Sequence, residues 1–593
     1  MKKFARKTAL VLLVLAALLA AGLGICRWLG KKNLADWRAA LAARGEKFNV
    51  TELVPLQTNQ PNDSLSKLVL AANRLNARVV DPGSISPLNI VQPGHAQIVW
   101  QEREIVTASG SGTNQWSATN RWADFTRQMA EAEEPLSEIR SALAEPAHDL
   151  GWDYRDITKS PDGSPVEKRR AAQWLWGATL DGLQRGDLGA ATTNLHALLS
   201  LTHLPDEAWT LNIQSIRVHI AGLALGATWQ ALQAPGWTEE RLAALQKEWE
   251  RVQLLEPFER TLQVERAQRL TFYGQLRQTS PQPVNARSPG GTATGFFPTN
   301  APGNAIREAC TEVFNQYVYT PTWQVAWSEQ DELFYLQNVQ PVLEAIRVGV
   351  TRHVWPEMKA ILQTAPARHD SPTKFYYRYC CPWSQFLLGN WDKTLETVAR
   401  TETLKQMAIT AIALKRYQLK HAQLPPDLTA LAPDYVSRPP VDFMDGQPLR
   451  YRPKPEGAFT LYSVGLDGKD DGGDPLPATI WEWRNDLWVG RDVLWPLPVT
   501  PETASPAAST RTQIVFDNVR LIEVLKILTE QMGWSLQIEN NLLAAQTKSA
   551  NRVDLRMEKA TPVEALEAVA QKYNLRFIRI PNTRTAGIAH REK

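Results

Sequence analysis

The sequence predicts a multidomain, mainly α-helical protein, in which an N-terminal apolar helix and an irregular helical domain precede two small α+β modules. Three observations support this fold class. The chain has 593 residues, more than one ordinary hydrophobic core accommodates. Its 44% hydrophobic and 21% charged residues are typical of a folded globular protein. Apolar residues recur at helical spacing over most of the chain, and strand patterns join them mainly near the C-terminus.

The overall charge argues against a nucleic-acid partner. The 65 Lys and Arg residues nearly balance the 62 Asp and Glu residues, so the formal net charge is only +3. No strong positive field is therefore expected to attract nucleic acid. The 22 Trp residues are unusually many, and we expect most of them to fill cores. The alternative is that some form a surface on which a ligand stacks.

Residues 1–32 are predicted to be a membrane anchor. The apolar run 9–26 is about long enough to cross a bilayer as a helix, which takes roughly 20 residues. Four basic residues precede it, namely Lys2, Lys3, Arg6 and Lys7. Two alternatives remain open: a cleaved signal peptide, with "AALLAAGLG" offering small-residue cleavage sites, and a lipoprotein box ending at Cys26. We expect one continuous, uncleaved helix over 9–26.

The chain has four cysteines, Cys26, Cys310, Cys380 and Cys381. This number is too small for a fold held together by disulfides. The sequence also has no CxxC motif of the kind that binds a metal. Two alternatives are open for Cys310, Cys380 and Cys381. Either Cys310 forms a disulfide with Cys380 or Cys381, which are adjacent in the sequence, or the thiols are free and buried.

Residues 33–390 are predicted to form an irregular helical domain. Its clearest helices span 165–186, 188–202, 206–233 and 238–254. The stretch "GATLDGLQRGDLGAATTNLHALLSL" predicts a helical hairpin, with small residues at the helix contact and a Gly-Asp turn. It resembles a tetratricopeptide unit loosely, but no second copy follows at a fixed period. The chain has no HExxH, GxSxG or Walker-type motif, so no catalytic residue is predicted.

Residues 391–498 are predicted to form an α+β module. A long helix-patterned run leads through "YQLKHAQLPPDLTAL" and "DGQPLRY" to "FTLYSVGLDGKDDGG". Over about 393–480 this order resembles the C-terminal half of type II secretion major pseudopilins. The "LYSVG" stretch is expected to be the last strand of a small antiparallel sheet that packs on the 393–420 helix. Pseudopilins carry their membrane segment at the start of this same helix, whereas here the helical domain separates the two.

The acidic loop that follows is the candidate metal site. In pseudopilins the corresponding loop binds calcium, so the resemblance implies Ca²⁺ as a cofactor held by Asp467, Asp470, Asp471 and Asp474. Carboxylates on a glycine-turned loop suit a hard cation. Gly468, Gly472 and Gly473 are expected to adopt positive φ and to give a tight surface turn. The alternative is a solvated turn without a metal.

A linker, residues 499–511, is expected within the Pro-, Ser-, Thr- and Ala-rich stretch 495–512. Beyond it, residues 512–593 are predicted to form a β-α-β-β-α-β domain. Its second helix has Thr561 as the N-cap, Pro562 in the first turn and Glu564 at capping-box spacing. The pattern over about 512–581 resembles the short secretin and TonB N-terminal domain. That resemblance implies a periplasmic module that binds other proteins and does no chemistry.

Together these features favour a non-catalytic, membrane-anchored bacterial envelope protein. It would act as a scaffold or interaction module, with a secretion- or pilus-type assembly as a candidate context. We expect it in the inner membrane with a single span and most of the chain in the periplasm. The expected partners are the membrane, through residues 9–26, and other envelope proteins. The competing hypothesis is an envelope hydrolase with a site in the Trp-rich helical region.

Overall fold

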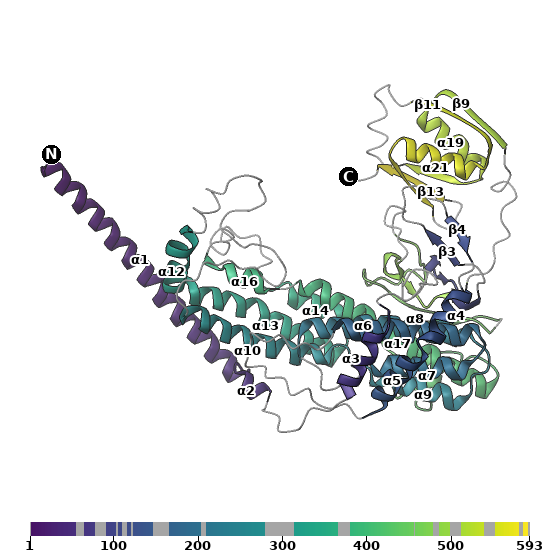
Figure 1. Ribbon diagram of the computed structural model, residues 1–593, viewed down its shortest axis with the longest axis horizontal. Coiled ribbons are helices and arrows are strands. Elements are labelled where there is room, and N and C mark those ends of the chain that lie inside the picture. The colour runs from purple at the N-terminus through teal and green to yellow at the C-terminus, as the bar shows by residue number, and fades with distance from the viewer. Residues whose placement is uncertain are drawn as a thin grey trace.

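A computed structural model describes residues 2–54, 64–76, 90–101, 105–108, 116–119, 122–145, 165–202, 209–278, 313–365, 380–388, 390–455, 457–477, 486–498, 512–538, 552–579 and 585–590. The protein is mainly α-helical, with small sheets, as the sequence predicts. Figure 1 shows an elongated helical body, with helix α1 projecting from one end and a small α+β domain near the C-terminus at the other.

Helix α1 (Lys2–Ala43) is one continuous helix of 42 residues, which confirms a single helix over 9–26 and extends it. Its apolar first half is exposed, whereas Leu34 and Leu41 are buried in the body. The helix is terminated by Gly45, which lies two residues beyond Ala43 and has a φ of +87°. There the N–H of Glu46 donates to the carbonyl oxygen of Leu41 at 3.1 Å, a Schellman-type ending that turns the chain back toward the body.

The predicted helical hairpin is present as α6 (Pro165–Gln184) and α7 (Leu188–Ser200). The two helices nearly touch at Gly182, where an added Cβ would lie 2.9 Å from the backbone nitrogen of Ala191. Gly186 makes the turn with a φ of +74°. Asp187 caps α7 by accepting from the Ala190 N–H at 2.9 Å. Small residues at the contact and a Gly-Asp turn therefore produce this hairpin.

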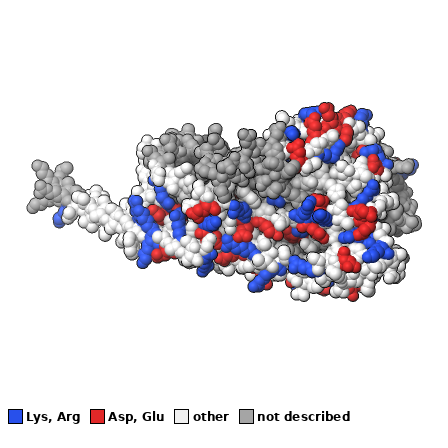
Figure 2. All heavy atoms as spheres, turned by 90° about the horizontal axis from the view of Figure 1, so that it is seen from below, with Lys and Arg blue, Asp and Glu red and all other residues white. Residues whose placement is uncertain are grey.

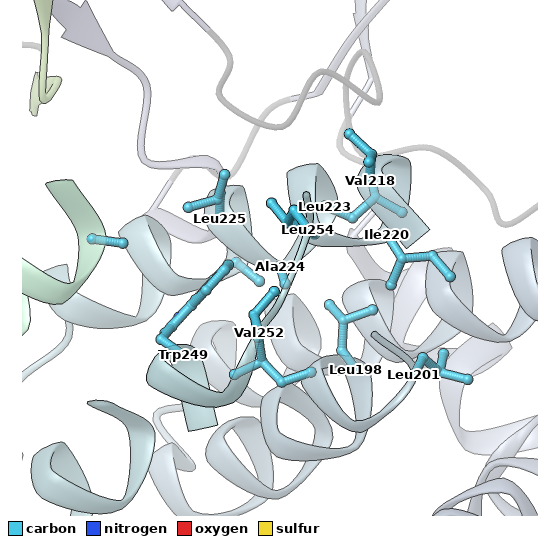
Figure 3. Packing of buried hydrophobic residues seen from close by; sticks show 14 of the residues in the cluster. Leu198, Leu201, Val218, Ile220, Leu223, Ala224, Leu225, Trp249, Val252 and Leu254 are labelled. Atoms are coloured by element: carbon cyan, nitrogen blue, oxygen red, sulfur yellow. The ribbon is translucent and has the colours of Figure 1, made fainter. Parts of the chain in front are cut away.

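Helices α8 (Leu211–Gln233) and α9 (Glu239–Arg251) complete the centre of the body. Figure 3 shows Trp249 and Val252 of this region pointing toward Ala224 of α8. Among the described residues, Trp174, Trp229, Trp249 and Trp323 are some of the largest fully buried side chains. Core filling is thus the role of these rings.

Further helices surround this centre and extend it toward α1. Helix α13 (Ser328–Arg352) packs against α1, α10 (Glu256–Gln278) and α14 (Trp355–Leu362). The other helical elements of the body are α2 (Val50–Leu53), α3 (Ser64–Arg74), η1 (Val99–Gln101), α4 (Trp122–Glu131), α5 (Glu133–Ala144), η2 (Asn315–Tyr319), α12 (Thr320–Thr322), η3 (Trp323–Trp327) and α16 (Pro382–Leu387).

The predicted 391–498 module consists of α17 (Trp391–His421), the short helical turns η5 (Leu428–Leu431) and η7 (Leu487–Val489), and the antiparallel sheet β5 (Arg450–Pro453), β6 (Phe459–Ser463) and β7 (Val493–Leu494). Strand β6, which contains most of "LYSVG", packs on α17. It is the central strand and not the last one, because β7 pairs with its second edge. Helix α17 also packs on α8 and α9, so one hydrophobic core runs through this module and the helical domain.

Short strands connect the module to the body. Strand β8 (Leu497–Pro498) pairs in parallel with β2 (His95–Ala96), which pairs with β1 (Ile90–Gln92). A separate hairpin joins β3 (Ile105–Ala108) and β4 (Trp116–Thr119). The indole N–H of Trp229 donates to the carbonyl oxygen of Pro496 at 2.7 Å. Residues 495–498 of the predicted linker stretch are therefore part of the body, and 499–511 lie outside the described residues.

The C-terminal segment forms a domain with its own core. Its order, β9 (Thr512–Arg520), α19 (Leu521–Gln531), β10 (Ser535–Ile538), β11 (Arg552–Ala560), α21 (Pro562–Lys572) and β12 (Leu575–Arg579), is the predicted one. An additional strand, β13 (Thr585–His590), lies between β10 and β12 in the sheet. The capping box is also confirmed, since Thr561 and Glu564 bond each other's backbone N–H groups at 3.2 and 2.8 Å.

Candidate functional site

The turn after α1 is fixed to the body by a partly buried ionic cluster, here called the anchor clamp: Glu46, Arg266, Gln340, Arg347 and Glu259. The Glu46 carboxylate accepts from Arg266 Nη2 at 2.7 Å, from Gln340 Nε2 at 3.1 Å and from Arg347. Arg266 also donates to Gln340 Oε1 at 3.0 Å, and Arg347 donates to Glu259 at 2.6 Å. Helices α10 and α13 thus hold the turn that follows α1.

Two opposing effects set the pKa of Glu46. Burial raises it, but the hydrogen bonds from Arg347 and Arg266 outweigh burial and lower it to about 2. The side chains of Glu46 and Arg266 are only 4% and 1% exposed. Removal of one partner from a buried charge pair leaves the other charge buried without compensation. Loss of the Glu46 carboxylate would therefore leave the buried guanidinium of Arg266 without its ionic partner, whereas Arg347 would keep Glu259.

More contacts tie α1 to α13 nearer the projecting end. Gln330 Nε2 donates to the carbonyl oxygen of Cys26 at 2.6 Å. Arg38 of α1 and Arg277 of α10 both pair with Glu332, whose side chain is fully buried. The helix is thus held along its second half and not only at its end.

A second buried acid, Asp331, organises the same end of the body. Its carboxylate accepts from the Tyr273 hydroxyl, the Trp323 indole and the backbone N–H groups of Trp383 and Ser384, at 2.9 to 3.1 Å. Burial raises its pKa to about 6, although the bonds from Ser384 and Trp323 act in the opposite direction. Asp331 therefore caps α16 and fixes η3 to α13.

The cysteines of this region are not bridged to one another. Cys380 and Cys381 are buried beside Asp331, and burial raises the pKa of Cys380 to about 12. Within the described residues, Cys26, Cys380 and Cys381 are free. Cys310 lies outside the described residues.

The predicted metal ligands lie on one exposed turn after β6. Asp467 accepts from the Lys469 N–H at 3.1 Å. Asp470 accepts from the Tyr462 hydroxyl and the Gly472 N–H, both at 3.0 Å, and pairs with Arg450 at 3.5 Å. Asp474 pairs with Arg491 at 2.8 Å. Two of the four carboxylates are thus neutralised by arginine.

Asp492, which sequence reasoning did not identify, organises this turn. It is buried, and its carboxylate accepts from the N–H groups of Gly473 at 2.7 Å, Asp474 at 3.1 Å and Asp471 at 3.5 Å. Burial raises its pKa, while the backbone N–H groups act in the opposite direction. The only sequence signal was an acidic residue immediately before β7.

The turn has the expected backbone. Gly468, Gly472 and Gly473 have φ values of +70°, +76° and +82°. In the part of the chain that the structure describes, no group of three or more His, Cys, Asp and Glu side chains is arranged to hold a metal ion. Calcium binding by Asp467, Asp470, Asp471 and Asp474 stays a prediction.

A cleft of about 310 Å³ lies where α17 meets the end of α13. Its titratable lining residues are Glu250, Glu256, His353, Glu402, Lys405 and Arg438. Glu402 pairs with Lys405 at 2.6 Å, and Lys405 donates to the Val252 carbonyl oxygen at 2.8 Å. His353, which ends α13 with a φ of +55°, has its pKa lowered by burial. The volume suits a small ligand.

Comparison with known proteins gives no further guide to the site. No protein-family model, curated protein or solved structure matches this chain.

Proposed function

We propose that the protein is a membrane-anchored bacterial envelope scaffold that holds interaction modules at a fixed position on the inner membrane. One observation carries this proposal: an exposed apolar helix, long enough to span a bilayer, continues without a break into a helix clamped to the body. In Figure 2 the described part of the projecting rod is almost entirely white, whereas side chains of both charges are spread over the described part of the visible body. Such a rod is stable in lipid but costly in water.

The two α+β modules supply the interaction part of the proposal. The 391–498 module combines a long helix with a small antiparallel sheet, and the C-terminal domain has the β-α-β-β-α-β order with one added strand. These arrangements are compatible with the resemblance to pseudopilins and to the short secretin and TonB N-terminal domain. We therefore propose envelope assemblies of the secretion or pilus type as partners, with most of the chain in the periplasm.

Two measurements test this function. The protein should remain in the membrane fraction after alkaline extraction, and N-terminal sequencing should show that α1 is retained. After chemical crosslinking in intact cells and detergent extraction, envelope proteins should co-purify with the full chain and fall away when residues 512–593 are deleted. Release by alkali, or an N-terminus beyond Cys26, would refute the anchor. The same partners with and without 512–593 would refute that module's role.

An envelope hydrolase is the second candidate, because six titratable side chains converge on the cleft. Turnover of ester, peptide or glycoside substrates by the purified chain, abolished by His353→Ala, would favour it. Equal rates in the wild type and His353→Ala would show that His353 does not carry the hydrolysis and would count against this candidate.

A further inference from the structure

An apolar patch lies beside α1 on the surface of the body. It consists of Val313, Phe314, Tyr317, Val318 and Val325, which are 56%, 39%, 68%, 50% and 45% exposed. Among the described residues outside α1, these are five of the ten large apolar side chains that are exposed. Exposed apolar residues are usually scattered singly over a protein surface, whereas here five of them lie on one short segment.

The patch lies on a helical segment whose C-terminal part is fixed to the body. Positions 313 and 317, and positions 314 and 318, are four residues apart, so the members of each pair are neighbours on the helix surface. Farther along the segment, in η3, Trp323 donates to Asp331 at 2.9 Å, Gln324 donates to the Leu276 carbonyl oxygen at 2.7 Å, and Ala326 is fully buried. The segment cannot turn its apolar face inward without breaking these contacts.

The patch lies at the end of the body from which α1 projects. Helix α13 runs in the same direction as α1, because Cys26 contacts Gln330, Arg38 contacts Glu332 and Arg44 contacts Glu344, in the same order along both helices. The segment that precedes α13 therefore extends toward the apolar half of α1. Its last part, η3, packs directly on α1, and Figure 1 shows α12 beside α1 at this end.

The composition of the segment fits the boundary between lipid and water. Residues 313–328 contain no charged side chain, and two of their aromatic side chains, Phe314 and Tyr317, are exposed. Tyr and Trp are enriched where a membrane meets water. The neighbouring part of α1 has the same character, since Trp28 is 61% exposed and Lys32 lies 5.6 Å from its ring centroid.

We propose that the patch rests in the lipid bilayer interface as a second membrane contact, beside the span formed by α1. The proposal rests on the membrane anchoring proposed above. Continuity with the exposed apolar surface of α1 favours lipid as the occupant over a second copy or another protein. Two contacts on one rigid body would fix its rotation about α1 as well as its distance from the membrane.

The test uses the full chain in vesicles of phosphatidylethanolamine and phosphatidylglycerol. Single cysteines are introduced by Leu13→Cys in the span, Val318→Cys in the patch and Leu419→Cys at the end of α17, and are labelled with an environment-sensitive fluorophore. Leu419 is the matched control, because it is apolar and 50% exposed like Val318. Labelled wild-type protein gives the background from the native cysteines. Lipids carrying a nitroxide near the headgroup or deep in the acyl chain serve as quenchers.

We expect blue-shifted emission at position 318, with more loss of intensity from the headgroup nitroxide than from the deep one. Position 13 should lose more intensity to the deep nitroxide, and position 419 should show neither shift nor loss. Quenching at 13 without quenching at 318 would overturn the patch proposal and leave the anchor intact. No quenching at 13 would refute the anchor itself. A blue shift at 318 without lipid quenching would mean that protein covers the patch, which also overturns the proposal.

Discussion

Replacing Glu46 by Gln should weaken the anchor clamp while keeping the shape of the side chain. The pKa of Glu46 falls from 4.5 to about 2 on folding, which corresponds to about 3 kcal/mol of stability from its ionised form. Loss of one partner of a buried pair costs about 3 to 5 kcal/mol in other proteins, so the two lines of reasoning agree. We expect Glu46→Gln to lower the free energy of unfolding of the body by about 3 kcal/mol at neutral pH.

The stability difference between the wild type and Glu46→Gln should depend on pH in a defined direction. A carboxylate whose pKa is lowered by folding stabilises the protein above its unfolded pKa, and this stability is lost as the pH falls through the folded value. The difference between wild type and Glu46→Gln should therefore be complete at neutral pH and shrink between about pH 5 and pH 2. The comparison of the two proteins removes the contributions that other titratable groups make to the pH dependence of stability. One of these groups is Asp331, whose raised pKa changes stability with pH in the opposite direction.

Urea unfolding in detergent, followed by tryptophan fluorescence, measures the effect. This signal reports the body, because residues 512–593 contain only Trp534. Arg44→Gln is the matched control, since Arg44, two residues before Glu46, pairs with Glu344 of α13 at 3.9 Å but is 71% exposed. Exposed pairs contribute about 0 to 1 kcal/mol. A Glu46→Gln effect no larger than that of the control, or one that does not change with pH, would refute the reasoning.

Three further predictions concern other parts of the chain. Gly182→Ala should destabilise the body by about 1 to 3 kcal/mol, because the added Cβ would meet the backbone of Ala191. Gly274→Ala in α10 is the control, since its Cβ would enter open space and should not destabilise the body. Urea unfolding of the two variants measures the difference. Thr561→Ala should cost the isolated 512–593 domain about 1 kcal/mol, measured by thermal unfolding, and an unchanged midpoint would contradict the capping role. If the acidic turn binds Ca²⁺, calorimetry on the full chain should detect a heat of binding, and the double variant Asp467→Ala, Asp471→Ala should abolish it. No heat at millimolar Ca²⁺ would show that the loop is a solvated turn without a metal.

Local sequence patterns predicted those helices and turns that are determined by contacts between residues close in the sequence. The α6 and α7 hairpin follows from Gly182 and the Asp187 cap, and the start of α21 follows from Thr561 and Glu564. All of these contacts join residues that are close in sequence, so spacing alone was informative.

The candidate sites depended on contacts that spacing does not encode. Glu46 and Arg266 are 220 residues apart, and neither stands in a recognisable motif. Asp492 was missed because it supports the acidic turn from the strand that follows it, and β7 itself has only two residues. Strand β13, "TAGIAH", carries too weak an alternation to be recognised without the partner strands on either side of it.

The unbroken course of α1 has a mechanical consequence. A helix of 42 residues is about 60 Å long, about twice the thickness of a bilayer core of about 30 Å. In the membrane-anchored arrangement proposed above, about half of the helix would lie in the bilayer, and the other half would be packed into the body without a break between them. A tilt of the span, such as one imposed by a thinner or thicker bilayer, would then rotate the body through the same angle. The C-terminal domain, at the far end of the body, would move farthest, so bilayer thickness would set its position relative to the membrane.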